Sequence, residues 1–188
     1  MTEATAGTDV VDELTTDHRE VTALLDELLT TTDPDTRRDM ADTAITELVR
    51  HSVAEEMYVY PAMREHLPDG EQVVQHDIEE HKDLERTMKE LEGCDATDPR
   101  FTALVSELRR KLHHHATDEE TEQFPQLRAR VPREKLVQMR EQVETAKKLA
   151  PTRPHPNAPN NALFHKLVGP GVGLMDRVRD KLTGRSSG

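Results

Sequence analysis

The chain has 188 residues, a net charge of -12 at pH 7 and an aromatic content of only 3%. This length suffices for one domain with a tail, and a core made mainly from Leu, Val, Ile, Met and Ala favours a helical bundle over a β-sheet. The negative charge argues against nucleic acid as the main partner, because phosphate binding depends on clustered Lys and Arg.

Three features of the sequence bear on its compartment. The single Cys94 excludes an internal disulfide, and the polar start MTEATAGTDVVDEL lacks the apolar core of a signal peptide. No apolar run is long enough to cross a membrane. We therefore expect a cytoplasmic protein and no membrane partner.

Apolar residues recur at three- and four-residue spacing in four long segments, which predicts amphipathic helices over 9–31, 34–66, 70–92 and 99–130. Asp33-Pro34 and Asp98-Pro99 are start signals, because Asp caps free N–H groups and Pro suits the first helical position. Gly93 is a stop signal for the third helix. A shorter fifth helix is predicted over 132–149.

The sequence changes character at residue 151. PTRPHPNAPNN (151–161) is a Pro-rich linker, and the whole stretch 151–188 carries six basic and two acidic residues. We therefore divide the chain into a bundle over 1–150 and a basic amphipathic tail over 151–188. The tail is expected to dock on the acidic body or to reach another subunit in a homo-oligomer, and to be dispensable for metal binding.

The body contains an internal repeat. EHKDLERTMKEL (80–91) aligns with DHREVTALLDEL (17–28), and HATDEETEQFP (115–125) aligns with HSVAEEMYVYP (51–61). A repeat of this kind indicates two duplicated helical hairpins. The predicted fold is therefore all-α, an up-down four-helix bundle followed by the short fifth helix and the tail.

Ionisable residues interrupt the apolar stripe of every predicted helix. His51, Glu55 and Tyr58 fall within about 60° of one another at 100° per residue, whereas Tyr60 lies about 160° away from Tyr58. The same frame places three residues of the fourth helix inward, namely His115, Glu119 and Glu122. The stripes of the first and third helices contribute His18, Asp77 and His81.

Carboxylates in an apolar interior are very costly unless they are paired or bind metal. A lone buried His is more often a core residue, and an isolated HxxxE occurs by chance, but both recur here in a repeat. Glutamates that bridge two cations, each with two imidazoles, explain the pattern, and these ligands suit iron, manganese or zinc. His113 and His114 point away from the stripe, and His76 is expected to be solvated.

The order His18, His51-x-x-x-Glu55, His81, His115-x-x-x-Glu119 resembles the hemerythrin-like (HHE cation-binding) family over roughly residues 9–130. The resemblance implies a four-helix bundle around two non-haem iron ions joined by an oxo or hydroxo bridge. It also implies terminal histidine ligands and two bridging glutamates, Glu55 and Glu119.

The sequence departs from the oxygen-carrying members of that family. Asp77 stands where they have a second histidine, and the last motif is HxxxE rather than HxxxxD. We therefore expect a protein that binds or reacts with oxygen species, most concretely a catalase- or peroxidase-like di-iron enzyme that disproportionates hydrogen peroxide. The alternatives are a module that senses or binds oxygen, nitric oxide or iron without turnover, and a bundle that uses metal only for stability.

Three further residues are candidates around the metal ligands. Tyr58 is interpreted either as a direct ligand or as a core ring with a hydrogen-bonded hydroxyl, the commoner role of a buried tyrosine. Asp77 and Glu122 are expected to ligate metal or to support the ligands.

Overall fold

The computed structural model describes residues 8–155 together with Asp176 and Asp180. This part of the chain is helical and contains no strand, so the all-α prediction is confirmed. The elements are, in chain order, α1 Val10–Thr30, α2 Pro34–Ala54, η1 Glu55–Val59, α3 Tyr60–His66, α4 Gly70–Glu92, α5 Arg100–Asp118, η2 Glu119–Gln123, α6 Phe124–Arg130 and α7 Arg133–Leu149.

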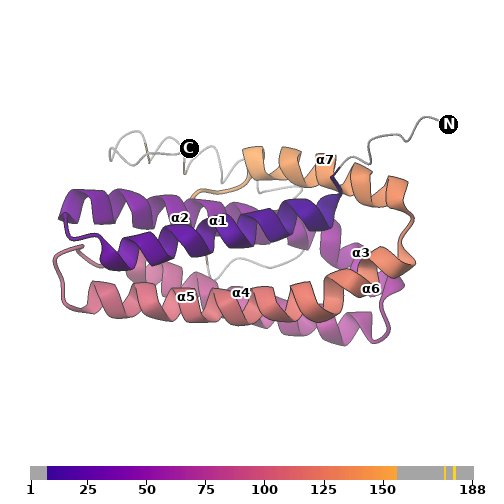
Figure 1. The fold of residues 1–188 in the computed structure, drawn as a ribbon, viewed down its shortest axis with the longest axis horizontal. Coiled ribbons are helices and arrows are strands. Elements are labelled where there is room, and N and C mark those ends of the chain that lie inside the picture. Colours follow the sequence, from indigo (N-terminus) through magenta and orange to yellow (C-terminus); the bar gives the residue numbers. More distant parts are fainter. Residues whose placement is uncertain (1–7, 156–175, 177–179, 181–188) are drawn as a thin grey trace.

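Four helical rods lie side by side along the long axis of the molecule (Figure 1). Two of them are composite, since α2, η1 and α3 follow one another without a break, as do α5, η2 and α6. The rod formed by α1 packs against α2 and α5, and α4 packs against α5 and α2. Helix α7 lies against the outside of α1 and α2.

Asp33-Pro34 acts as the predicted start signal, whereas Pro99 of the second signal is the N-cap of α5 rather than its first helical residue. The side chain of Asp33 accepts a hydrogen bond from the backbone N–H of Thr36, and Pro34 occupies the first helical position. Asp98 likewise accepts from the N–H of Arg100 at 2.8 Å, where α5 begins. Gly93 follows the last residue of α4.

Each composite rod contains one π-helical turn at its middle. The N–H of Tyr60 donates to the carbonyl of Glu55, and the N–H of Phe124 donates to that of Glu119, both at five-residue spacing. The residue after each aromatic is a proline, which has no N–H to continue the α-helical pattern. One extra residue per turn rotates the side chains that follow by about 100° relative to an uninterrupted α-helix.

The core consists of two hydrophobic clusters with a polar layer between them. One cluster includes Leu14, Ile78 and Phe124 and is closed by residues of α7. The other includes Val21, Leu84 and further residues toward the α1–α2 and α4–α5 connections. His18 and His81 lie between the two clusters in sequence. The polar layer therefore sits inside the bundle, at a distance from both ends.

The described residues of the tail contact the body. The carbonyl of Thr152 accepts from Thr46 Oγ1 at 3.3 Å, and Arg153 Nη1 lies 2.8 Å from Glu92 Oε1. Arg153 also binds Asp180, so these tail residues attach to the helices that carry Thr46 and Glu92. The remainder of the predicted tail lies outside the described residues, and its role in a homo-oligomer stays a prediction.

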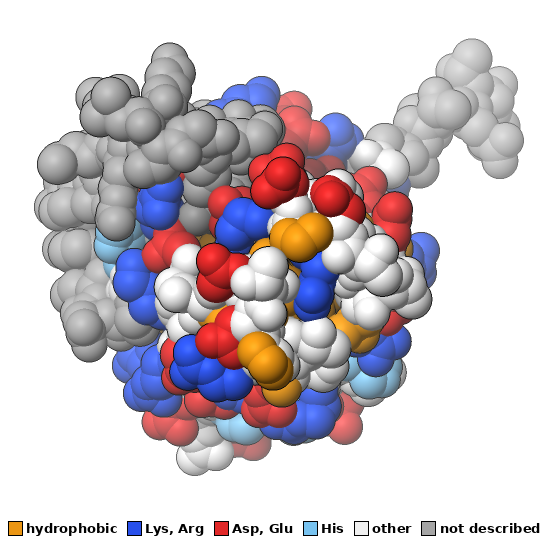
Figure 2. Space-filling view, turned by 90° about the vertical axis from the view of Figure 1, so that its left-hand side faces the viewer, with side chains coloured by type: hydrophobic (Ala, Val, Ile, Leu, Met, Phe, Trp, Pro, Cys, Tyr) orange, Lys and Arg blue, Asp and Glu red, His pale blue; other side chains and the backbone are white. Residues whose placement is uncertain are grey.

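The surface at the end of the bundle that carries the α1–α2 and α4–α5 connections mixes basic and acidic side chains, with small separate hydrophobic spots (Figure 2). Leu149 is the exposed large hydrophobic side chain found within the described ranges. None of the helices described there has the length and apolar character needed to cross a membrane.

Candidate metal centre

Six ionisable side chains meet in the polar layer, which we call the central layer. All are at most 3% exposed, and they come from all four rods: His18, His51, Glu55, His81, His115 and Glu119. The sequence-predicted ligands are therefore brought together by the fold. By contrast, His113 and His114 are exposed, in agreement with the helical phase expected for them.

The four histidines form two pairs through their Nε2 atoms. The Nε2 atoms of His18 and His51 are 3.1 Å apart, and those of His81 and His115 are 3.2 Å apart. Each pair joins two neighbouring rods. Two imidazole nitrogens are thus presented at each of two adjacent positions.

The two central glutamates connect these pairs. Glu55 Oε2 lies 3.2 Å from Nε2 of His51 and 3.4 Å from Nε2 of His81. Glu119 Oε2 lies 3.4 Å from Nε2 of His18 and 3.5 Å from that of His115. Each carboxylate therefore touches one histidine of each pair, which is the arrangement required of a ligand shared by two ions.

A second carboxylate holds the far nitrogen of every central histidine. We call these four groups the outer carboxylates, and their distances to Nδ1 are 3.0 Å for Asp17 on His51, 3.1 Å for Glu56 on His81, 2.9 Å for Glu80 on His115 and 2.9 Å for Glu120 on His18. A carboxylate only accepts, so it favours the tautomer with the proton on Nδ1. The lone pairs of the four Nε2 atoms then point into the central layer.

The central glutamates show that this layer suits a cation. Both carboxylates are fully buried, and none of their four oxygens has a hydrogen-bond donor. Four inward lone pairs and two ionised carboxylates without donors would be strongly unfavourable in a low-dielectric interior. Metal ions that accept imidazole and carboxylate ligands satisfy all of these atoms together.

Protons take the place of the metal in the metal-free protein. Burial alone lowers the pKa of His51, but the Glu55 and Asp17 carboxylates outweigh it and raise the pKa to about 10. The pKa of His81 is raised well above its usual value by Glu55 and Glu56, again against the effect of burial. Although burial raises the pKa of Glu55, the neighbouring His51 lowers it well below the ordinary range.

Metal binding at pH 7 is therefore expected to release at least one proton per chain. His51 carries a proton at this pH in the metal-free protein, since its pKa is about 10, and only the neutral imidazole can ligate a metal. Calorimetric titration with Fe²⁺ under anaerobic conditions, in two buffers of different ionisation enthalpy, counts the protons. No proton exchange, or net proton uptake, would contradict the expectation.

The same shifts predict different pH dependences for the metal-free and the iron-loaded forms. A His51 pKa raised from 6.5 to about 10 stabilises the metal-free fold fully below pH 6.5, and this contribution is lost as the pH rises toward 10. The melting temperature of the metal-free protein should therefore fall between pH 6.5 and 9. The gain in melting temperature on iron binding should grow over the same interval, because fewer protons compete. Parallel pH profiles of the two forms would be inconsistent with this account.

The tyrosine near the central layer is Tyr60, which corrects the expectation for Tyr58. The Tyr60 hydroxyl lies 3.1 Å from His81 Nε2, and its ring is 1% exposed. Tyr58 is only partly buried and packs against the hydrophobic cluster nearest α7. The physical reason is the π-helical turn η1, which brings position 60 rather than 58 onto the face of Glu55.

The matching position in the other half is occupied by Phe124. Its ring is stacked on His18 with 6.2 Å between ring centroids, while the Tyr60 ring is stacked on His81 at 5.5 Å. At this pair of positions the two halves of the site differ by one hydroxyl group. That hydroxyl is beside the His81 and His115 pair alone.

Asp77 is inward, as predicted, and Glu122 is not. Asp77 is fully buried, and its Oδ1 accepts from Gln123 Nε2 at 3.0 Å. Burial, followed by the charge of Glu119, raises the pKa of Asp77 to about 7. The expectation for Glu122 is corrected, because its side chain is exposed and the turn η2 places Gln123 inside instead.

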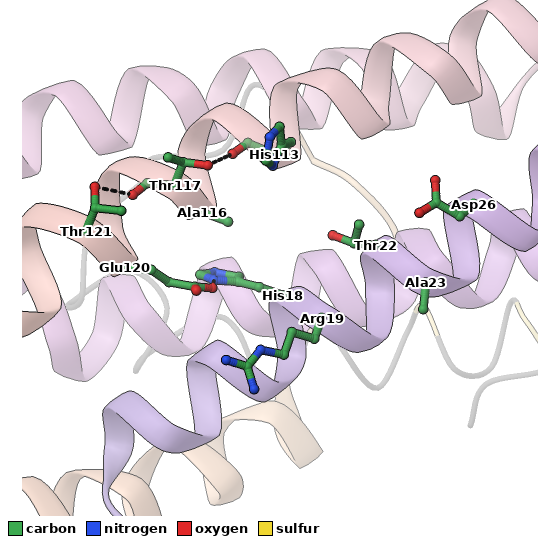
Figure 3. A pocket seen from close by; sticks show the side chains of 10 residues that line it. All are labelled: His18, Arg19, Thr22, Ala23, Asp26, His113, Ala116, Thr117, Glu120 and Thr121. Atoms are coloured by element: carbon green, nitrogen blue, oxygen red, sulfur yellow. Dashed lines mark hydrogen bonds and ion pairs between the residues drawn. The ribbon is translucent and has the colours of Figure 1, made fainter.

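A groove of about 410 Å³ has the buried His18 among its lining residues (Figure 3). It runs between α1 and the rod formed by α5 and η2, and its lining residues are His18, Arg19, Thr22, Ala23, Asp26, His113, Ala116, Thr117, Glu120 and Thr121. We call it the access groove. Figure 3 shows Glu120 and His18 lying together at its inner side.

The sequence reasoning missed two of the outer carboxylates. Asp17 and Glu80 were not among the residues predicted to support the site. Each of these two immediately precedes a central histidine and binds the histidine of a neighbouring rod. Asp17 and Glu80 occupy equivalent positions in the internal repeat, and this equivalence could have identified them.

Comparisons with known proteins agree with this geometry. A family model described as the hemerythrin HHE cation binding domain matches residues 9–127, which include all six residues of the central layer. An uncharacterized hemerythrin-like protein of Schizosaccharomyces pombe is 29% identical over 176 residues, covering 93% of this chain and 87% of that protein. A DNA nickase of Nostoc is 25% identical over 139 residues, covering 74% of this chain but 39% of that protein. No solved structure gives a significant match.

Proposed function

The chain belongs to the hemerythrin HHE cation-binding family, and from this premise we propose that it holds two iron ions and disproportionates hydrogen peroxide to oxygen and water. The observation that carries the proposal is the pairing of four inward Nε2 atoms around two shared carboxylates. His18 with His51 would hold one ion, and His81 with His115 the other. Glu55 and Glu119 would bridge the two ions.

Iron held by these ligands supplies reversible oxidation and reduction, so that one peroxide is reduced to two waters while a second is oxidised to oxygen. The protein contributes the buried ligand set and the four outer carboxylates that keep each Nε2 pointed inward. The Tyr60 hydroxyl, 3.1 Å from His81 Nε2, would be a further ligand for an ion held by that pair.

Asp77 is proposed to hold and transfer the proton that peroxide cleavage requires. Its Oδ1 is engaged by Gln123, while its Oδ2 is buried and has no hydrogen-bond partner. In the metal-free protein, burial and then the charge of Glu119 raise the pKa of Asp77 to about 7, so this carboxyl group can carry a proton near neutral pH. Asp77 is also close to the central layer, since its carboxylate lies within 4.8 Å of ligand atoms of His115 and Glu80.

The access groove is proposed as the route for small molecules. His18 is among its lining residues, together with small side chains such as Ala23 and Ala116. A volume of about 410 Å³ admits peroxide, oxygen or nitric oxide. The exogenous molecule would therefore arrive on the side of the His18 and His51 pair, opposite Tyr60.

Filling the groove should slow access without removing iron. Ala116→Leu adds bulk beside His18, and we expect the rate of azide binding to the iron-loaded protein to fall by about tenfold, equivalent to roughly 1.4 kcal/mol in the barrier. Stopped-flow absorption measures this rate. The matched control is Thr117→Val, which keeps the shape of the groove and should bind azide at the wild-type rate. Equal rates for all three proteins would place the entrance elsewhere.

The proposed reaction is tested by oxygen release from hydrogen peroxide. The iron-loaded protein should release one oxygen molecule for every two peroxides consumed over many turnovers, and Asp77→Asn should slow this release while keeping both irons. Binding of oxygen or nitric oxide without steady peroxide consumption would instead assign the site to a sensing or binding module. A cytoplasmic location remains part of the proposal.

A further inference from the structure

A second group of metal-binding side chains lies on the surface beside the central layer. His76 and Glu80 are one turn apart on α4, and His114 and Asp118 are one turn apart on α5. His76 Nε2 lies 3.5 Å from Glu80 Oε1, and ligand atoms of His76, Glu80 and Asp118 all lie within 4.8 Å of one another. We call these four residues the peripheral cluster.

His114 completes the cluster from the side of α5. Its Nδ1 lies 3.5 Å from Asp118 Oδ2, and its Nε2 lies 3.8 Å from Glu80 Oε1. The imidazoles are well exposed, at 58% for His76 and 61% for His114, so an ion from solution reaches them freely. Two imidazoles and two carboxylates on facing helical turns form a donor set that suits a divalent transition metal.

The other half of the internal repeat has different side chains at the positions equivalent to His76 and Glu80. There, Glu13 corresponds to His76 and Asp17 to Glu80. The ammonium of Lys147 sits between them, 3.1 Å from Glu13 Oε1 and 2.6 Å from Asp17 Oδ1. A cation supplied by α7 thus balances the outer carboxylate that holds His51.

Glu80 is the outer carboxylate in the equivalent position, and among the described residues its ion-pair partners are histidines, with no lysine or arginine. His76 stands in the place of Glu13, and Asp118 adds a further carboxylate. We propose that a divalent transition-metal ion, such as Zn²⁺, binds at the peripheral cluster through His76, Glu80 and Asp118, with His114 as a fourth ligand. This site is additional to the two ions of the central layer.

The peripheral ion would also act on the central layer through one side chain. Glu80 Oε1 faces the peripheral cluster, while Glu80 Oε2 accepts from Nδ1 of His115 at 2.9 Å. A cation on Oε1 withdraws electron density from the carboxylate that orients His115, and this changes the donor strength of that imidazole. Peripheral binding should therefore be visible in the spectrum of the central ions.

The test is the number of Zn²⁺ ions that the protein binds, measured by equilibrium dialysis with elemental analysis. Iron-loaded wild-type protein should bind one Zn²⁺ with no loss of iron, and its visible absorption should shift. His76→Ala and Asp118→Asn should each lose this Zn²⁺ and the shift while retaining iron and the wild-type melting temperature. The control His113→Ala removes a neighbouring exposed histidine that lies outside the cluster, and it should bind Zn²⁺ and show the absorption shift as the wild-type protein does.

The proposal would be overturned if His76→Ala bound as much Zn²⁺ as the wild-type protein. It would also be overturned if His113→Ala lost the Zn²⁺ ion as His76→Ala does. This result can be distinguished from a failure of the central layer to bind iron. If that layer held no iron, the metal-free wild-type protein should still bind one more Zn²⁺ than His76→Ala. Zn²⁺ binding without a spectral shift would keep the site but refute its connection through Glu80.

Discussion

Replacing Glu55 with alanine is expected to reduce the iron content from two ions to at most one per chain. Glu55 is fully buried and its carboxylate touches one histidine of each pair, so its loss removes a ligand from both ions. An ion present at 100 times its dissociation constant stabilises a fold by about 2.7 kcal/mol, and the iron-dependent stabilisation should fall by about this amount. Elemental analysis and thermal unfolding with and without iron measure both effects.

Glu56→Ala is the matched control for this substitution. Glu56 is the next residue, also buried, but its carboxylate binds Nδ1 of His81 rather than facing the shared position. Loss of such a supporting group weakens metal binding by about 10- to 100-fold without removing a ligand. We expect two irons in Glu56→Ala at saturating iron. Two irons in Glu55→Ala would show that the carboxylate does not bridge.

Replacing Tyr60 with phenylalanine is expected to abolish a broad visible charge-transfer band of the ferric protein while leaving both irons bound. In the metal-free protein, burial and the surrounding carboxylates, Glu55 foremost, raise the pKa of Tyr60 well above its usual value, so the phenol is protonated. A ferric ion at the His81 pair would displace that proton and bind the phenolate, because the hydroxyl lies 3.1 Å from His81 Nε2. Absorption spectra and iron analysis of the variant check this.

Tyr58→Phe provides the comparison, since it removes the same hydroxyl group from a ring that packs in the adjacent hydrophobic cluster. Its spectrum should match that of the wild-type protein. Loss of the band in Tyr58→Phe with retention in Tyr60→Phe would mean that the π-helical turn does not set the phase of this rod. A wild-type ferric protein without any such band would exclude Tyr60 as a ligand.

The apolar periodicity was sufficient to predict the rods and the inward histidines. The expected helices over 34–66 and 99–130 correspond to the composite rods, and the repeat selected His115 over its two exposed neighbours. These features depend on spacing within uninterrupted α-helix, where 100° per residue is a valid measure.

The inward-facing aromatic residues could not be predicted in the same way, because a rotation of 100° per residue does not hold across a π-helical turn. Counting at 100° per residue placed Tyr58 and Glu122 inward, whereas the five-residue hydrogen bonds at Tyr60 and Phe124 shift the phase. The repeated pattern of an aromatic followed by proline was the available signal. The peripheral cluster escaped prediction for another reason, since its exposed histidines lie off the apolar stripes from which the central ligands were inferred.

The central claim is tested most directly by counting iron. Wild-type protein loaded anaerobically with Fe²⁺ and freed of excess metal should contain two iron ions per chain, and Glu119→Ala, which removes the second shared carboxylate, should contain fewer. Elemental analysis against a protein concentration from amino-acid analysis gives the number. One iron ion per chain, or zinc retained in preference to iron, would contradict a di-iron centre built on the two histidine pairs.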